Sequence, residues 1–422
     1  MRLGVILSRR RKISPPAGVI LLIRIVNYEL KGGLHMNTFE LDKQYIAGTY
    51  KRFPIEIVSG KGSLVKDVNG REYIDMGSGI AVTSFGIADD VWIEAVEQQI
   101  HSVQHMSNLY YTAPCARLAK ALCEKTGMSK VFFSNSGAEA NECAIKAARK
   151  WAAEHKGPAC STIVTLENSF HGRTLTTLSA TGQEHYHELY QPLTPGFASF
   201  PAGDMDALKK LCAGGTVAAV LIECVQGEGG VVALDPAFVK ELAAYLKQQD
   251  IILMVDEVQT GNGRSGKMYA YMNYGLQPDV VSTAKGLAGG LPMGATLLGE
   301  KVKDVFSYGD HGSTFGGNPV AAAAALSVVS RLTDSFLEDV TRKSELIRSL
   351  LDGASGIESI SGLGLMIGLK TAKPASEVVT ACMENGVLCL TAKDKVRLLP
   401  ALNIPDDLLI KAAEVIKSAC AV

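Results

Sequence analysis

The sequence predicts an α/β protein in which a large domain with a mainly parallel sheet is joined to a smaller α+β domain. Continuous apolar segments such as 162–166 and 251–255 alternate with helical patterns through the middle of the chain. Such segments are typical of strands buried on both faces of a parallel sheet. After Pro319, two long helical patterns precede short strands mixed with helices. With 422 residues, of which 47% are hydrophobic, the chain can bury a large core.

The elements follow in a regular order. Within 43–90 a hairpin is predicted, with a turn at Val68-Asn69-Gly70, and a helix follows around 92–102. The further predicted strands cover 130–134, 162–166, 217–224, 251–255, 279–282, 365–369 and 387–390. The further predicted helices include an Ala-rich helix at 137–151, a helix at 237–249 with Val239, Leu242 and Leu246 on one face, and a final helix at 406–420.

We predict four segments along the chain. Residues 36–89 form the N-terminal part of the small domain, 90–318 the large domain, and 319–422 the C-terminal small domain. Residues 1–35 carry seven Lys or Arg and one acid, unlike the rest, and make a poor signal peptide. We favour a non-native extension, with translation beginning at Met36, over a transit peptide, which is usually richer in serine.

Composition excludes several classes of protein. Forty-two basic and 43 acidic residues give a net charge of −1, without the positive excess of a nucleic-acid binder. No apolar run reaches the ~18 residues that span a membrane. The nine cysteines form no CxxC pair, so no disulfide framework or zinc site is expected, and a cytoplasmic location fits best. His101 and His105 have helical spacing but no evident acidic third ligand, so we expect no metal site.

A phosphate site is one interpretation of residues 134–138. Ser136, Gly137 and Ala138 lie between a predicted strand and a predicted helix. The free N–H groups and the positive dipole end of a helix start suit a phosphate. An ordinary helix cap is the alternative, because Ser and Asn are preferred there.

Two charged side chains follow neighbouring strands. Asp256 ends a buried strand, where a carboxylate needs a partner such as a cationic ring nitrogen, a nearby Arg or a cap position. Lys285 follows the next strand beside small residues, where burial lowers an amine's pKa and makes it nucleophilic. A surface lysine is the common alternative.

Phe170-His171-Gly172-Arg173 places a flat ring and a guanidinium close together. Arginine is suited to bidentate carboxylate binding, and a core Phe with a surface Arg is the alternative. Gly261 to Gly266 matches G-x-G-x-x-G, but it lies late in the chain and polar residues separate it from its strand. A nicotinamide site is therefore not favoured.

Taken together and in this order, these segments resemble the class-III aminotransferases, which have fold type I and depend on pyridoxal phosphate. The resemblance covers roughly Phe39 to the C-terminus. The segments that carry it are 134–141 (SNSGAEAN), 170–173 (FHGR), 223–230 (ECVQGEGG), 255–261 (VDEVQTG), Lys285 and 313–319 (STFGGNP).

The resemblance implies roles for the residues at the cofactor. Lys285 would bond covalently to the cofactor aldehyde and move the proton during reaction, and Asp256 would keep the pyridine nitrogen protonated. Gln259 would donate to the phenolic oxygen, and Phe170 would stack on the ring. Ser136, Gly137 and Ala138 would hold the phosphate. Thr314 would reach the phosphate of the neighbouring subunit, which implies a homodimer.

Within the family, the chain is similar to the acetylornithine aminotransferases. The resemblance implies N2-acetyl-L-ornithine as donor and 2-oxoglutarate as acceptor, giving N-acetyl-L-glutamate 5-semialdehyde and L-glutamate by a ping-pong mechanism in arginine biosynthesis. Arg173 would hold the carboxylate of acetylornithine, and Arg397 that of 2-oxoglutarate. Glu228 would pair with Arg397 when the ω-amino substrate is bound.

Other donors stay open, namely succinylornithine, succinyl-diaminopimelate, ornithine and 4-aminobutyrate. Ile80 stands where ornithine aminotransferases usually carry Tyr, which argues against free ornithine. Residues 86–90, Gly-Ile-Ala-Asp-Asp, depart from the family's usual Gly-His and Pro, and we expect a local change in packing rather than lost chemistry. A cofactor-binding regulator without turnover is the alternative from another class, and the full set of catalytic side chains argues against it.

Overall fold

The structure, a computed structural model, describes residues 37–422, which fall into two compact units, 37–56 and 57–422. The first unit contains helix α2 (Thr38–Tyr45). Asn37 caps this helix reciprocally with Glu40, since each side chain accepts a hydrogen bond from the other's backbone N–H. The proposed extension 1–35 and the proposed start at Met36 lie outside the described residues.

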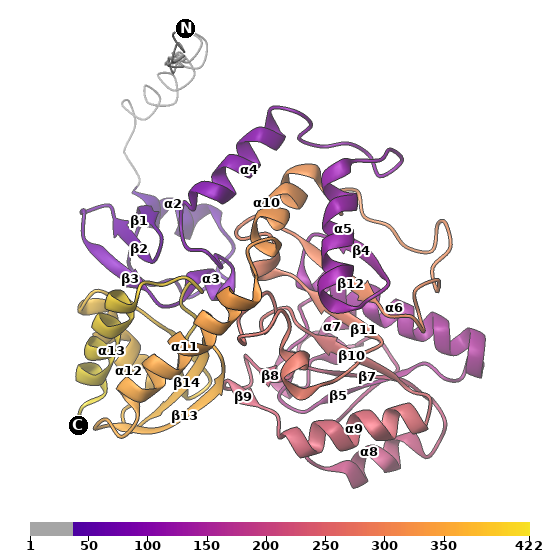
Figure 1. Cartoon of the computed structure of the whole chain (residues 1–422). Coiled ribbons are helices and arrows are strands. Elements are labelled where there is room, and N and C mark those ends of the chain that lie inside the picture. The colour runs from indigo at the N-terminus through magenta and orange to yellow at the C-terminus, as the bar shows by residue number, and fades with distance from the viewer. Residues whose placement is uncertain (1–36) are drawn as a thin grey trace, which may run out of the picture. The chain divides into compact units, whose positions relative to one another are not determined.

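A seven-stranded sheet forms the centre of the second unit (Figure 1). Only β12 runs opposite to the common direction of the other strands, so the predicted α/β class with a mainly parallel sheet is confirmed. In spatial order the strands are β4 (Lys130–Ser134), β12 (Gly294–Leu298), β11 (Val280–Thr283), β10 (Ile252–Asp256), β7 (Val217–Ile222), β5 (Thr162–Leu166) and β6 (Phe197–Phe200).

Helices of this unit pack on both faces of the central sheet and around the smaller sheets. They are α3 (Ser78–Ala81), α4 (Asp90–Ile100), α5 (Ala113–Thr126), α6 (Gly137–Lys156), α7 (Leu175–Ala180), α8 (Met205–Cys212), α9 (Pro236–Gln248), α10 (Pro319–Val329), α11 (Asp334–Leu351), α12 (Ala375–Glu384) and α13 (Asp406–Cys420). The short 3₁₀ helices η2 (Ala270–Tyr274) and η3 (Lys285–Leu287) lie in the loops after β10 and β11.

Alternating side chains of β7 explain why its sequence is apolar throughout. Val220 and Ile222 belong to the core cluster that contains the apolar face of α9, whereas Ala219 and Leu221 belong to the cluster that contains α6. Because successive side chains of a strand point to opposite faces, a strand covered on both sides needs a continuous apolar run. The strand β12, although fully buried, was not predicted, because its five residues follow a glycine-rich loop and carry no flanking helical pattern.

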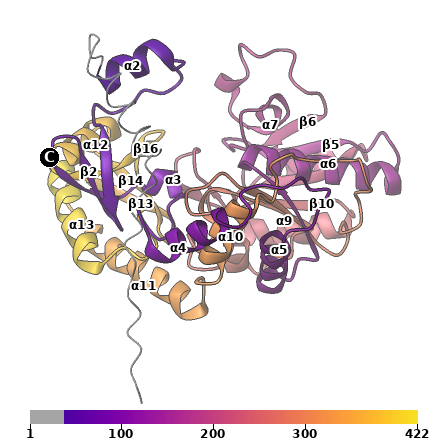
Figure 2. The ribbon, with the colours of Figure 1, turned by 90° about the horizontal axis from the view of Figure 1, so that it is seen from above.

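Two smaller sheets combine segments that are far apart in the sequence. β15 (Val387–Leu388) pairs with β3 (Glu72–Asp75), next to β2 (Leu64–Asp67) and β1 (Ile57–Lys61). Figures 1 and 2 accordingly show the indigo strands beside the yellow C-terminal helices. The other sheet orders β13 (Ile357–Leu363), β14 (Met366–Thr371), β17 (Lys395–Leu398) and β16 (Leu390–Ala392). The predicted boundaries near 89 and 318 stay predictions.

The predicted hairpin turn is present between β2 and β3. Gly70 has φ +82° and its N–H donates to the carbonyl of Asp67. The Asp67 carboxylate also accepts hydrogen bonds from the N–H groups of Asn69 and Arg71. Glycine is favoured at positions with a positive φ, which explains why the turn contains Asn69-Gly70.

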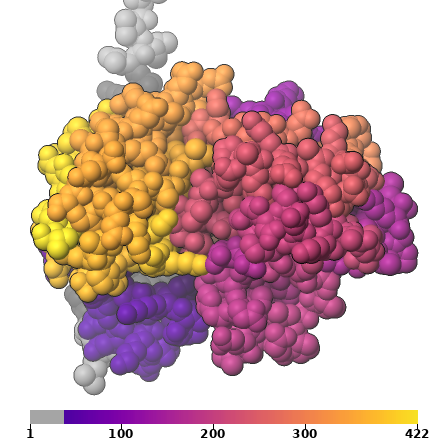
Figure 3. All heavy atoms as spheres, turned by 90° about the horizontal axis from the view of Figure 1, so that it is seen from below, coloured from indigo at the N-terminus to yellow at the C-terminus, as the bar shows by residue number. Residues whose placement is uncertain are grey.

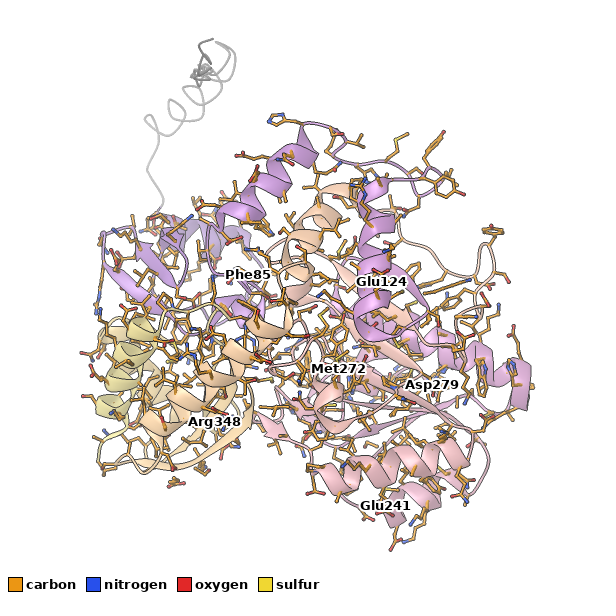
Figure 4. All side chains as sticks on the ribbon, viewed as in Figure 1. Phe85, Glu124, Glu241, Met272, Asp279 and Arg348 are labelled. Carbon is orange, nitrogen blue, oxygen red and sulfur yellow. The ribbon has the colours of Figure 1, made fainter. Side chains whose placement is uncertain are left out.

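Residues 86–90 form a tight connection into α4. Asp89 caps the helix at Trp92 N–H and pairs with Arg331 at 2.8 Å. The guanidinium of Arg331 lies 3.7 Å from the ring centroid of Phe85, which is labelled in Figure 4. Trp92 Nε1 donates to the carbonyl of Ala288, in the loop that follows Lys285. Residues 86–90, which differ from the family pattern, are therefore joined through the start of α4 to the loop that follows Lys285.

The C-terminal part of the chain packs directly against the middle part, as the orange and salmon surfaces in Figure 3 show. Two carbonyl groups of this part, those of Leu365 and Pro400, accept hydrogen bonds from Arg264. Across residues 37–422, no single helix is long and apolar enough to cross a bilayer, and only the bent pair α10 and α11 passes by length and composition together.

Candidate active site

Polar side chains meet where the strands of the central sheet end. β4, β7, β10 and β11 are parallel to one another, so their carboxyl ends lie at one edge. A cavity of about 450 Å³ opens there. It brings together most of the residues that the sequence predicted for the site, namely Ser136, Gly137, Ala138, Phe170, Arg173, Asp256, Gln259 and Lys285.

Asp256 is held by three donors at the end of β10. Its Oδ2 atom lies 2.7 Å from Asn141 Nδ2 and 2.8 Å from His171 Nδ1, and its Oδ1 atom accepts from Val258 N–H at 2.9 Å. Asn141 is itself fixed by Ser282, whose hydroxyl donates to Asn141 Oδ1. This network orients a buried carboxylate toward the cavity, where a cationic partner would stabilise it.

The start of helix α6 forms a candidate phosphate cradle. Ser136 caps the helix by accepting from Glu139 N–H, so the cap interpretation of this cluster is also true. A Cβ atom on Gly137 would lie 2.7 Å from Val258 Cγ1, so only glycine leaves the backbone free at this point. Gly137 and Ala138, the first residues of the 20-residue helix, line the cavity at the end where the helix dipole favours an anion.

Lys285 lies in the cavity wall directly after β11 and begins η3. Its φ of +45° is unusual for a residue with a side chain, and such backbone strain clusters at functional sites. Burial lowers the pKa of Lys285, while Glu228, Asp256 and Glu223 oppose that change and Arg397 adds to it. A desolvated amine of lowered pKa is a better nucleophile at neutral pH.

Phe170 and Arg173 line the same cavity from the loop after β5. The ring of Phe170 lies 5.9 Å from that of Tyr186, edge to face, and the guanidinium of Arg173 lies 4.7 Å from the Tyr186 ring centroid. Arg173 is exposed, and within the described residues it forms no ion pair. Its donors can therefore reach a carboxylate that enters the cavity.

Gln259, Glu228 and Arg397 form a connected group beside the cavity. Arg397 Nη1 lies 2.5 Å from Glu228 Oε1 and 3.2 Å from Gln259 Oε1, and Gln259 Nε2 lies 3.4 Å from the same Glu228 oxygen. Burial raises the pKa of Glu228, but attraction by Arg397 and Lys285 outweighs it and holds this pKa below its usual range. The Glu228 carboxylate is therefore ionised opposite the cation.

Thr314 is the one predicted site residue that the structure leaves outside this cluster. It is exposed and absent from the cavity wall. The neighbouring Ser313 bonds Asn135 Nδ2 through its hydroxyl at 3.1 Å, which ties this loop to the start of α6. A residue that completes the site of another subunit must be exposed on its own subunit.

Three polar residues of the site received no role from the sequence, although they lie in the segments that carry the resemblance. Asn141 and His171 hold Asp256, and Glu223 accepts from Phe170 N–H at 2.9 Å and from Gly227 N–H. Burial raises the pKa of Glu223 to about 7. Glu223 directly follows β7, so its place at a strand end was the available signal.

A larger cavity of about 760 Å³ lies elsewhere, lined mainly by residues 179–199. It contains none of the predicted site residues, so size alone does not identify the chemical site. The smaller cavity is favoured because it combines a nucleophilic amine, a buried carboxylate and a helix start.

Comparisons with known proteins agree with this geometry. Residues 45–420 match the family described as aminotransferase class-III. The acetylornithine aminotransferase of Haemophilus ducreyi is 50% identical over 379 residues, covering 89% of this chain and 96% of that protein.

Two solved structures are also similar. The acetylornithine aminotransferase of Elizabethkingia anophelis has a TM-score of 0.80 and 31% identity, covering 90% of this chain and 97% of that one. A Toxoplasma gondii ornithine aminotransferase structure with partial occupancy of PLP at the active site has a TM-score of 0.87 and 32% identity, covering 94% and 97%.

Proposed function

Because this chain belongs to the class-III aminotransferases, we propose that it transfers the terminal amino group of N2-acetyl-L-ornithine to 2-oxoglutarate. The products are N-acetyl-L-glutamate 5-semialdehyde and L-glutamate, a step of arginine biosynthesis with ping-pong kinetics. The chain is an aminotransferase and its cofactor is pyridoxal phosphate. The observation that supports the reaction class is the meeting of Lys285, Asp256 and the start of α6 in one cavity.

The residues present fit this cofactor. Bound pyridoxal phosphate supplies an aldehyde and an electron-accepting ring that let an amino group leave one substrate and be stored for the next. Asp256, held by His171 and Asn141, would keep a proton on the ring nitrogen. Ser136, Gly137 and Ala138 would hold the phosphate. Phe170 would cover the ring, and Gln259 would donate to the phenolic oxygen.

Lys285 carries out the proton transfer. Its amine would hold the cofactor through the aldehyde carbon, with loss of water, in the absence of substrate. Once free, the same amine would act as the base that removes a proton from the reacting substrate carbon and gives it back later in the reaction. Because burial lowers its pKa, more of this amine is unprotonated near neutral pH than of an exposed lysine. An amine of ordinary pKa would be almost fully protonated there.

Glu228 and Arg397 let one site accept two different substrates. While they are paired, Arg397 offers no free cation, so the ω-amino donor binds through its carboxylate to Arg173. When 2-oxoglutarate enters, its α-carboxylate takes the place of Glu228 at Arg397. The 28% exposure of the Glu228 side chain gives this carboxylate room to turn away.

A homodimer is part of this proposal. In it, Thr314 completes the phosphate site of the neighbouring subunit. The surface near Thr314 supports an interface, because large apolar side chains are exposed on the loops around it, among them Leu109, Tyr110, Tyr111, Tyr308 and Phe315. Asn108 joins these two loops through hydrogen bonds to the carbonyls of Ser313 and Gly316. Such patches mark protein–protein contacts. The cytoplasmic location stays a prediction.

Ornithine as donor is the second candidate, because ornithine aminotransferases are among the similar structures. Ile80 favours acetylornithine over ornithine: it presents an apolar side chain, 40% exposed, that offers no hydrogen bond to an α-amino group. Ile80 has φ +63° within α3, a rare conformation for a β-branched residue.

A donor panel tests the substrate. Purified protein with pyridoxal phosphate and 2-oxoglutarate is given acetylornithine, succinylornithine, ornithine and 4-aminobutyrate in turn, and glutamate formation is measured. We expect the highest kcat/KM with acetylornithine. A higher value with ornithine would overturn the assignment of the donor while leaving the reaction class intact.

A further inference from the structure

Arg264 is among the most deeply buried large side chains of the described residues, with 2% exposure. Burying a guanidinium is unfavourable unless its donors find acceptors. Arg264 forms no ion pair within residues 37–422. Burial lowers the pKa of its guanidinium, and the attraction of Asp75 offsets only part of that change. Its partners are instead two backbone carbonyls. A buried cation whose side-chain partners are two backbone carbonyls indicates that its role is to position the segment that carries them.

Those two carbonyls belong to the C-terminal part of the chain. Arg264 Nη1 donates to Pro400 O at 2.5 Å and to Leu365 O at 3.2 Å. The backbone takes part as well, because Leu365 N–H donates to Arg264 O at 2.9 Å. Gly364 permits this approach: with φ +58°, an added Cβ would lie 2.4 Å from Arg264 O.

Pro400 is three residues after Arg397 and lies just beyond the end of β17. Between them, Leu399 is held on both sides: its N–H donates to Met76 O at 2.6 Å, and its carbonyl accepts from Ser78 Oγ at 2.5 Å. Ser78 belongs to α3, where four successive residues have positive φ. This strained backbone is kept in place by contacts such as these.

The backbone of Arg264 belongs to the loop that begins at Asp256 and includes Gln259. Gln259 Oε1 accepts a hydrogen bond from Arg397 Nη1 at 3.2 Å. The loop that carries the cofactor's predicted partners is thus joined twice to the segment that carries Arg397, once through Gln259 and once through Arg264. The glycine-rich stretch 261–266, which resembles a nucleotide loop, serves this packing.

We propose that Arg264 is a positioning residue that fixes Arg397 relative to the cofactor site and thereby sets the affinity for the carboxylate of the keto acid. This inference rests on the proposed function of Arg397. Arginine suits the position because both bonds come from Nη1, whose two N–H donors are fixed in the plane of the guanidinium, whereas the donors of a lysine ammonium rotate on a flexible stem. Displacements near 1 Å are enough to change a bound substrate's reactivity strongly.

The test compares Arg264→Met and Arg264→Lys with wild-type holoenzyme and with Arg149→Lys. Arg149 is a matched control, because it also donates to backbone carbonyls, those of Ser161, Pro195 and Gly196, far from the site. Each protein is assayed for KM and kcat in both half-reactions. Binding of glutarate, a dicarboxylate without a keto group, is measured by calorimetry, and folding by circular dichroism and Tm. Ser78→Ala removes the hydrogen bond to the Leu399 carbonyl and is the variant to use if Arg264→Met does not fold.

We expect Arg264→Met to raise the KM for 2-oxoglutarate and the glutarate Kd by about tenfold or more, with a smaller rise for Arg264→Lys and none for Arg149→Lys. The rate with acetylornithine should change much less. Equal losses in both half-reactions, or unchanged glutarate binding by a folded Arg264 variant, would overturn the inference. A wild-type protein that binds glutarate but uses no donor would instead refute the proposed function.

Discussion

Arg397 and Glu228 form an ion pair across two segments 169 residues apart, with 2.5 Å between Arg397 Nη1 and Glu228 Oε1. The Arg397 side chain is 4% exposed and that of Glu228 28%. The cation is therefore fixed in the interior, while the carboxylate lies where it can turn toward solvent. The Arg397 Nε atom is buried and has no hydrogen-bond partner in the described residues.

Replacing Glu228 by alanine should shift the enzyme toward α-amino substrates. Without the carboxylate, Arg397 stays available to the α-carboxylate of glutamate, and the half-reaction with acetylornithine slows relative to that with glutamate, by about tenfold or more. The two rates are measured from the cofactor's absorbance in single turnovers. Glu241→Ala, at an exposed position labelled in Figure 4, is the control. An unchanged ratio would contradict the role of Glu228.

Lys285→Ala should lower kcat by about 10²–10⁴-fold or more, because the site loses the group that moves the proton. Reduction of wild-type holoenzyme with borohydride should attach the cofactor to the peptide that contains Lys285. The peptide with Lys343 is an internal control, since this lysine is also buried but pairs with Asp339 and Asp406. If the label were found on any other lysine, the cofactor assignment of Lys285 would be wrong.

Mixing two inactive variants tests whether Thr314 acts on the neighbouring subunit. Thr314→Asp should repel the phosphate, and Lys285→Ala removes the amine. After both are dissociated and re-paired at equal amounts, about a quarter of wild-type activity should return, because about half of the dimers then carry one intact site. Thr314 acting within its own subunit would give no recovery. Light scattering confirms that each variant is a dimer before the mixing.

Glu257→Gln should change how stability depends on pH. Burial raises the pKa of Glu257 to about 7, although Thr260 and two backbone N–H groups oppose that change. Its folded pKa exceeds the unfolded one, so its contribution is fully present below about pH 4.5 and is lost as pH rises through about 7, with a magnitude near 3 kcal/mol.

The stability of wild type relative to Glu257→Gln should therefore be highest at acid pH and fall toward pH 8, because glutamine does not titrate. Apparent Tm values measured from pH 5 to 8 check this. Because Glu223 also has a raised pKa, only the difference between the two proteins is informative. A difference that is constant across this range would show that Glu257 stays ionised in the folded protein.

The order of strands and helices could be predicted because each central strand is apolar along its whole length, as in 217–222 and 252–255. Asp256 and Lys285 could be proposed because charged residues interrupt such runs at their carboxyl ends. Phe170 and Arg173 could be singled out by residue type, whereas Gln259 entered only through the resemblance to a family. Local pattern could not predict β12, whose antiparallel place between β4 and β11 depends on pairing alone.

The sequence by itself determined which reactive groups are present: an amine, a carboxylate and a helix start at the ends of parallel strands. Only the tertiary structure decided which partners these groups have. His171 and Asn141 hold Asp256, and Arg264 and Ser78 hold the segment of Arg397. Such pairings join residues up to 321 positions apart. They arise from the packing of whole elements, and no local periodicity encodes them.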